Sequence, residues 1–202
     1  ALFALQDPSG YWCGELEADT TLESDTIKFW RVLGRVDPER ERKLAAQILA
    51  KQLADGGWSI YEGGPSELNA TVKAYFALKL AGQPPSGGVL TTARATILRL
   101  GGLGRVNSFE KTYLAMFGQY PWSQVPALPP ELMLLPTWCP FNIYEVSAWS
   151  RTILIPLAIL YATRPAIPVP TGCGLDELWS DPARRVSVMT NRSTEGATWR
   201  RC

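Results

Sequence analysis

The sequence predicts an all-α protein built from helical hairpins. Apolar residues recur at intervals of three and four over residues 1–164, and almost no segment alternates between apolar and polar residues as a half-buried strand does. In addition, the pattern Gln-x-x-x-Gly-x-Trp occurs twice, at residues 6–12 and 52–58, one hairpin length apart. With 202 residues and a hydrophobic share of 46%, we expect a single compact domain.

Local signals predict the first two helices. The residues Thr20-Thr21-Leu22-Glu23 fit a capping box before a helix that ends near residue 33. Asp37 and Pro38 fit an N-cap and a first-turn proline for a second helix up to residue 54, whose Arg/Glu cluster we expect to face solvent. The apolar residues expected to face inward are Leu22, Ile27, Trp30 and Leu33 in the first helix, and Leu44, Ile48 and Leu53 in the second.

Three further helices are expected over residues 67–82, 91–102 and 108–118. The first buries one apolar face and ends at Gly82, and the second ends in a pair of glycines. The third begins at Ser108 as a cap. It places Phe109, Tyr113 and Phe117 on a single face, and geometry alone favours ordinary core packing for this stripe.

The second half of the chain is less regular. Six prolines between residues 119 and 140 exclude a continuous helix there, and helical periodicity resumes at Asn142 with a kink expected at Pro156. Residues 165–179 contain three prolines and predict an extended linker, while residues 180–202 are polar and predict a disordered tail. The helical-hairpin part is therefore expected to end near residue 164.

The repeated motif favours a structural role. Glycine allows a sharp turn, tryptophan offers a large flat ring, and the glutamine amide can cap a helix end or pack on that ring. We expect each copy to join neighbouring hairpins and to serve stability rather than chemistry. The residues concerned are Gln6, Gly10 and Trp12 in the first copy and Gln52, Gly56 and Trp58 in the second.

Composition excludes several functions. The chain has no histidine and four scattered cysteines, so no metal site is predicted and Ser-His or Cys-His catalysis is absent. A net charge of +1 with no basic stripe argues against nucleic acid as a partner. The longest strongly apolar run, over residues 152–163, is interrupted by a proline and is too short to span a bilayer.

Several long blocks resemble one family. The two Gln-x-x-x-Gly-x-Trp motifs look like the QW motifs of triterpene cyclases. GYWCGELEADTTLESD, DGGWSIYEGGPSELNATVKAYFALKLAG, FGQYPWSQVPALPPELMLLP and FNIYEVSAWSR resemble, in order and spacing, the N-terminal part of bacterial squalene–hopene cyclase. The resemblance covers about residues 2–179, and the pattern is lost in the tail.

This resemblance implies a partial α/α barrel of the terpenoid cyclase and prenyltransferase type. Members are isomerases or lyases that fold squalene in a cavity between two barrels, protonate a terminal double bond and guide carbocations to hopene or hopanol. They need no cofactor. The resemblance also implies a monotopic protein on the cytoplasmic face of a bacterial membrane, and a possible homodimer when full length.

The family's acid motif is not found in this chain. Its proton donor is an aspartate of an Asp-x-Asp-Asp sequence, whereas no two aspartates here lie within three positions of each other. The chain also opens without an initiator methionine, in what looks like the end of a helix. We therefore expect an N-terminal portion of a longer enzyme, inactive by itself. The alternative is a non-catalytic α/α repeat module with an interaction or lipid-binding surface.

Three positions correspond to cavity residues of the family. Trp149 and Phe109 match a tryptophan and a phenylalanine that line the cavity, and Asp25 aligns with an acidic residue near its polar end, where the final cation loses a proton or gains water. Members often have glutamate there. The competing interpretation is core packing for the two aromatic residues and, for Asp25, a solvated carboxylate favoured by the helix dipole.

Overall fold

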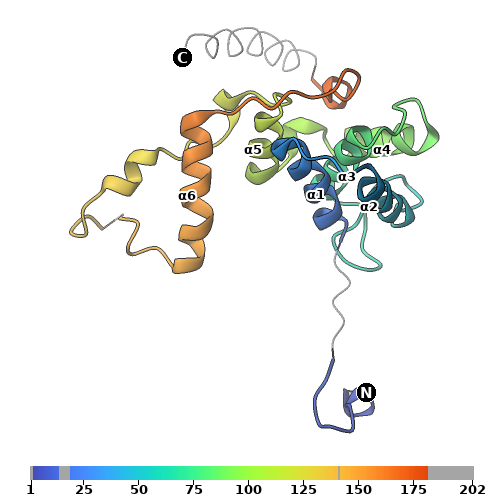
Figure 1. Cartoon of the computed structure of the whole chain (residues 1–202), viewed down its shortest axis with the longest axis horizontal. Coiled ribbons are helices and arrows are strands. Elements are labelled where there is room, and N and C mark those ends of the chain that lie inside the picture. Colours follow the sequence, from blue (N-terminus) through green and yellow to red (C-terminus); the bar gives the residue numbers. More distant parts are fainter. Residues whose placement is uncertain (1, 14–18, 141, 182–202) are drawn as a thin grey trace.

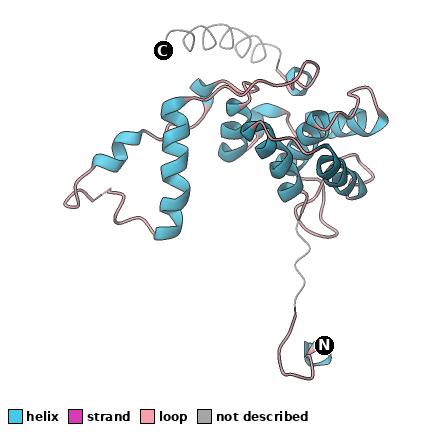
Figure 2. Ribbon diagram, in the orientation of Figure 1, coloured by secondary structure: helices cyan, strands magenta, loops and turns pink. Residues whose placement is uncertain are grey.

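The computed structural model describes residues 2–13, 19–140 and 142–181, and these ranges contain helices, turns and extended loops but no strand (Figure 2). The all-α prediction is confirmed. The α-helices are α1 (Thr21–Leu33), α2 (Pro38–Ala50), α3 (Leu68–Leu80), α4 (Gly88–Arg99), α5 (Ser108–Met116) and α6 (Ala148–Thr163). The 3-10 turns are η1 (Leu2–Leu5), η2 (Leu103–Arg105), η3 (Trp122–Gln124), η4 (Pro130–Leu134) and η5 (Asp176–Leu178). Residues 182–202 of the expected disordered tail lie outside the described residues.

Capping side chains set where the first helices begin. The Asp37 carboxylate accepts hydrogen bonds from the backbone N–H groups of Glu39 and Arg40, so the predicted start of α2 is confirmed. The capping box at α1 is wrong, because the Thr20 side chain makes no cap hydrogen bond. Instead, Asp19 accepts from the Thr21 N–H at 3.0 Å.

Two later helix starts also differ from the prediction. Helix α5 is capped by Asn107, whose side chain accepts from the Glu110 N–H, and not by Ser108. Helix α6 begins at Ala148 rather than near Asn142, because the Asn142 side chain accepts from the N–H groups of Tyr144 and Glu145 and holds a turn there. Asparagine is suited to both tasks, since its short amide competes well for nearby backbone groups.

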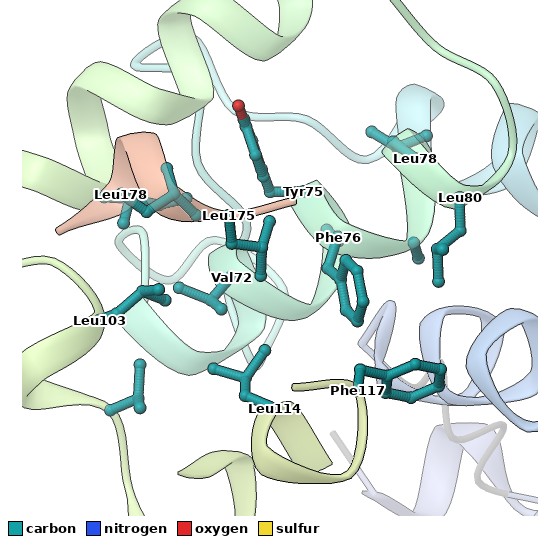
Figure 3. Close-up of a cluster of buried hydrophobic side chains, with 14 of the residues drawn as sticks. Val72, Tyr75, Phe76, Leu78, Leu80, Leu103, Leu114, Phe117, Leu175 and Leu178 are labelled. Carbon is teal, nitrogen blue, oxygen red and sulfur yellow. The ribbon is translucent and has the colours of Figure 1, made fainter. Parts of the chain in front are cut away.

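Helix α3 is the centre of the fold. It contacts α1, α2 and α4, and it is buried on nearly every side instead of along the single face expected. Figure 3 shows its side chains meeting residues of α5, η2 and η5 in one apolar cluster. The labelled members of that cluster are Val72, Tyr75, Phe76, Leu78, Leu80, Leu103, Leu114, Phe117, Leu175 and Leu178.

Residues 165–181 form a strap that returns from the end of α6 to α3 and α4 (Figure 1). The Ile167 N–H donates to the carbonyl of Met116 at 2.8 Å, and Leu175 is fully buried. The ammonium of Lys79, itself buried in α3, lies 2.6 Å from Glu177, which also accepts from the Tyr75 hydroxyl. The segment expected to be a linker is extended, but its second half is part of the core.

Burial raises the pKa of Glu177, but hydrogen bonds from Lys79 and Tyr75 outweigh that effect and leave it lowered. The carboxylate is therefore held in its charged form at the buried end of α3.

Helix α1 exposes apolar residues that were expected to face inward. Ile27 is buried as predicted, but Leu22 and Leu33 are exposed together with Phe29. The inward face carries Ser24 and Lys28 instead. Because α1 is packed on α3 and α2 through one side, its other side presents an apolar stripe to solvent.

One residue of the Arg/Glu cluster of α2, which was expected to face solvent, is buried. This residue is Glu41, whose carboxylate pairs with Arg31 of α1. The same guanidinium donates to the carbonyl of Leu80 at 2.7 Å. This arginine therefore joins α1, α2 and the end of α3.

Both QW motifs have the same internal hydrogen bond. The Gln6 amide donates to the Gly10 carbonyl at 2.8 Å, and the Gln52 amide donates to the Gly56 carbonyl at 2.9 Å. The second copy is also packed on α4, because the Gln52 amide reaches the carbonyl of Val89 at 3.1 Å.

The two motif tryptophans differ in burial. Trp58 is 1% exposed and donates its indole N–H to the carbonyl of Ile48 at 2.7 Å. Trp12 is 48% exposed and makes an edge contact with Phe3. The second copy thus contacts both α2 and α4.

Helix α6 lies to one side of the α1–α4 group and contacts η4 (Figure 1). It contains Pro156 and ends at Thr163, and the C-cap residue Arg164 adopts a left-handed conformation. Among the described residues, no helix is long and apolar enough to cross a membrane.

The motif glycines provide a matched test of this packing. Both have positive φ, but a Cβ at Gly56 would lie 2.6 Å from the backbone of Thr92, whereas one at Gly10 meets nothing within 4 Å. We expect Gly56→Ala to lower the free energy of unfolding by about 2–4 kcal/mol through strain and overpacking. Gly10→Ala should cost about 1–2 kcal/mol, from the positive φ alone. Urea denaturation of both variants measures the difference, and equal losses would contradict the docking of the second motif on α4.

The exposed stripe of α1 predicts self-association of the isolated chain. Replacing Phe29 and Leu33 with glutamate should shift the sedimentation profile toward monomer, because it removes the apolar contact area. Replacing the exposed Arg42 of α2 with glutamate is the control and should leave the profile unchanged. A parent chain that sediments as a clean monomer would rule out this expectation.

Candidate functional site

An apolar pocket lies between α5, the proline-rich segment after it, and α6. Its wall includes Phe109, Trp122, Leu128, Leu154 and Tyr161, and none of its lining residues is charged. The cavity volume is about 130 Å³, below the roughly 300 Å³ at which pockets for organic ligands begin. The pocket formed by the described residues is therefore too small to enclose an organic ligand of ordinary size.

Helix α5 turns two aromatic rings toward this side of the molecule. Phe109 is 48% exposed and Tyr113, one turn further on, is 39% exposed. Only Phe117 is in the core, where its ring lies edge-on to Phe76 with centroids 5.3 Å apart. Ordinary core packing of the whole stripe is thus wrong, because its first two members keep ring surface accessible.

A charged cluster adjoins the second of these rings. It consists of Asp25 and Lys28 of α1, Lys73 of α3 and Glu110 of α5, arranged around Tyr113. The Lys28 ammonium lies 2.8 Å from Asp25 and 3.8 Å from Glu110, and the Lys73 ammonium lies 3.4 Å from Asp25.

Both lysines of the charged cluster also face the aromatic ring. The Lys28 and Lys73 ammonium groups are 5.3 and 5.9 Å from the Tyr113 ring centroid, within cation–π range. Burial and the charge of Asp25 raise the pKa of the Tyr113 hydroxyl. The ring therefore stays neutral at physiological pH and joins the apolar wall to the charged cluster.

Glu110 is the most buried member of the cluster. Its side chain is fully enclosed, and neither carboxylate oxygen accepts a hydrogen bond from the described residues. Burial raises its pKa, and the nearby Lys28 opposes this only in part. Glu110 thus favours the neutral acid more than an ordinary glutamate does.

The structure brings together two of the three positions expected at the site. Phe109 lines the pocket, and Asp25 is linked to the next turn of α5 through the lysines and Tyr113. Trp149 lies on the first turn of α6 with 75% of its surface exposed, so core packing does not hold for it within the described chain. No described contact joins Trp149 to the other two residues.

Sequence reasoning missed Lys28, Lys73 and Glu110. The available signal was weak: Lys28 follows the buried Ile27, and Glu110 precedes the buried Leu114 by four positions, so a charge replaces an apolar residue on each inward face. Such interruptions are normally solvated charges, and only tertiary contact shows that these two meet.

Helical hairpins joined by a QW motif agree with the α/α class of triterpene cyclases that the sequence resembles. The match to a family model is more specific. Residues 1–202 match the model of the squalene–hopene cyclase N-terminal domain, and the chain belongs to that family.

Individual relatives agree with this assignment. The chain is 42% identical over 180 residues to the squalene–hopene cyclase of Zymomonas mobilis, with 89% of this chain and 27% of that protein covered. It is 36% identical over 186 residues to the squalene–hopene cyclase of Alicyclobacillus acidocaldarius, covering 91% of this chain and 30% of that protein.

A plant relative broadens the set. Dammaradiene synthase of the fern Dryopteris crassirhizoma is 34% identical over 180 residues, which cover 89% of this chain and 26% of the synthase. The chain thus spans about a quarter to a third of the length of these relatives.

The raised pKa of Glu110 makes stability depend on pH. The folded state holds the Glu110 proton more tightly than the unfolded state does. The contribution of Glu110 to the free energy of unfolding is therefore full at low pH and is lost as pH rises through the folded-state pKa. We expect Glu110→Gln, which keeps the size and removes the charge, to gain stability relative to the parent as pH rises from about 5 to about 8. Urea midpoints at both pH values measure this gain. The exposed Glu39→Gln is the control, and a constant gap between parent and variant would contradict the effect.

Proposed function

We propose that the chain is the N-terminal part of an enzyme that converts squalene to hopene or hopanol through a cascade of carbocations started by protonation. The family assignment and the names of the bacterial relatives support this activity. The observation in the structure that carries the proposal is the position of two rings on α5: Phe109 lines the apolar pocket, and Tyr113, one turn further on, lies beside the lysines that pair with Asp25.

This arrangement suits carbocation chemistry. The face of an aromatic ring attracts positive charge, and an apolar wall keeps out water that would intercept a cation too early. In the proposal, Phe109 and Trp149 offer ring faces to passing cations, and the Asp25 carboxylate accepts a proton at the last step. Asp25 suits that role because its side chain is 34% exposed, so that it can return the proton to solvent.

The acid that starts the cascade is not in this sequence. Its aspartates are Asp7, Asp19, Asp25, Asp37, Asp55, Asp176 and Asp181, none of them in an Asp-x-Asp-Asp motif. Asp55 cannot substitute for it, because hydrogen bonds from Ser66 and from Gly57, together with Arg99, lower its pKa despite some burial. A lowered pKa favours a carboxylate, which does not protonate an alkene.

We also propose monotopic association with the cytoplasmic face of a bacterial membrane, and a homodimer when the protein is full length. Exposed Leu134 at the end of η4, and exposed Trp138 and Tyr144 between η4 and α6, support contact with a lipid surface. Tryptophan and tyrosine favour the membrane interface because one part of each ring is apolar and another is polar.

Incubation with squalene tests the activity. We expect no pentacyclic product from residues 1–202 alone, because the initiating acid is missing. We expect hopene or hopanol from a gene-encoded chain that contains these residues together with an Asp-x-Asp-Asp motif. Gas chromatography with mass spectrometry of the hydrocarbon extract gives the answer. Pentacyclic product from the short chain would refute the missing-acid argument.

The same experiment addresses a second function. The exposed apolar stripe of α1 favours a non-catalytic α/α module that binds a partner or lipid. Failure of the longest gene-encoded chain to cyclise squalene, combined with binding of this chain to lipid vesicles, would favour the module over the enzyme.

A further inference from the structure

Arg164 adopts a backbone conformation that an arginine disfavours. It has φ 44° and ψ 56°, and among the described residues it is the only one other than glycine with a positive φ. This left-handed region is unfavourable for any residue with a Cβ, and at the end of a helix it is usually occupied by glycine. Pro165 adds to the strain, because a proline favours an extended backbone at the residue before it.

The path of the backbone explains a turn at this position but not an arginine. The Arg164 N–H donates to the carbonyl of Leu160 at 2.8 Å, which caps the end of α6. The chain then leads into the strap, where the Ile167 N–H donates to the carbonyl of Met116. A glycine would make the same turn and the same capping hydrogen bond with less strain. The reason for an arginine therefore lies in its side chain.

The Arg164 side chain lies over the ring of Tyr161. Its guanidinium carbon is 5.4 Å from the ring centroid, within cation–π range. Tyr161 is half-buried and lines the apolar pocket together with Phe109 of α5 and Trp122 of η3. Arg164 itself is exposed and does not line that pocket. It therefore touches the pocket only through the Tyr161 ring.

On the basis of the proposed function, we propose that Arg164 is a positioning residue: its guanidinium holds the Tyr161 ring in the wall of the apolar pocket, one of the surfaces against which the hydrocarbon of squalene binds. A tyrosine side chain has alternative staggered rotamers, and a contact made in one of them favours that one. A ring that already faces a guanidinium attracts a second cation only weakly, because the two positive charges repel each other. Tyr161 thus contributes shape and apolar area to substrate binding rather than stabilisation of the carbocations.

Steady-state kinetics of the gene-encoded chain that contains residues 1–202 test the proposal. With squalene dispersed in detergent, we expect Arg164→Gly to raise KM about two- to fivefold and to leave kcat unchanged, the loss that follows from removing one exposed cation–π contact that acts on binding alone. The same variant should keep or raise the urea midpoint, because glycine relieves the backbone strain as the contact is lost. An arginine with a merely structural role would leave KM unchanged.

A double-variant cycle identifies the ring as the group through which Arg164 acts. Tyr161→Leu removes the ring and should also raise KM, and adding Arg164→Gly to it should raise KM no further. Arg164→Lys keeps a cation at the same place and should restore KM at least in part. Arg42→Ala is the control, because this exposed arginine of α2 is remote from the pocket wall and should leave KM unchanged.

The possible failures are distinct. A parent protein that forms no cyclic product overturns the proposed function itself. A parent that cyclises squalene, with Arg164→Gly leaving its KM unchanged, overturns only the role of Arg164. Additive effects of Arg164→Gly and Tyr161→Leu on KM overturn it as well, because the arginine would then act other than through the ring. A lower urea midpoint for Arg164→Gly does the same, because it assigns the arginine to the stability of the fold.

Discussion

The enclosure of α3 is the constraint on which the rest of the structure depends. Helix α3 carries apolar residues on nearly every side, so it must be covered on every side. Helices α1, α2 and α4 and the strap each cover one part of it. Its polar groups need partners as well, since a buried charge left alone is costly. The Lys79–Glu177 pair meets that need and fixes where the strap can lie.

The same enclosure creates the candidate site. Because α1 and α5 both pack near α3, the charged residues on their inward faces meet where the helices come together, and Lys73 of α3 completes the group. The outward turn of α5 then places Phe109 against the apolar pocket. The core packing and the candidate site thus both depend on the place where α1, α3 and α5 meet. A substitution that loosens α5 would disturb both.

Features that depend on neighbours in the sequence were predictable, and features that depend on tertiary contact were not. The all-α class and the Asp37 cap follow from local patterns. The exposed side of α1 did not, because periodicity shows that residues share a face but not which face is covered. Resemblance selected Phe109 and Asp25, whereas the burial of Glu110 emerges only from packing.

The strap also has a consequence for the order of folding. Lys79 and Glu177 are 98 positions apart, whereas α1 to α4 contact one another within the first half of the chain. Closing a long loop is entropically slow relative to forming local contacts. During synthesis, the four helices can associate before Glu177 leaves the ribosome. Until then the Lys79 end of α3 lacks its covering strap, and apolar surface exposed in this way promotes aggregation of a nascent chain.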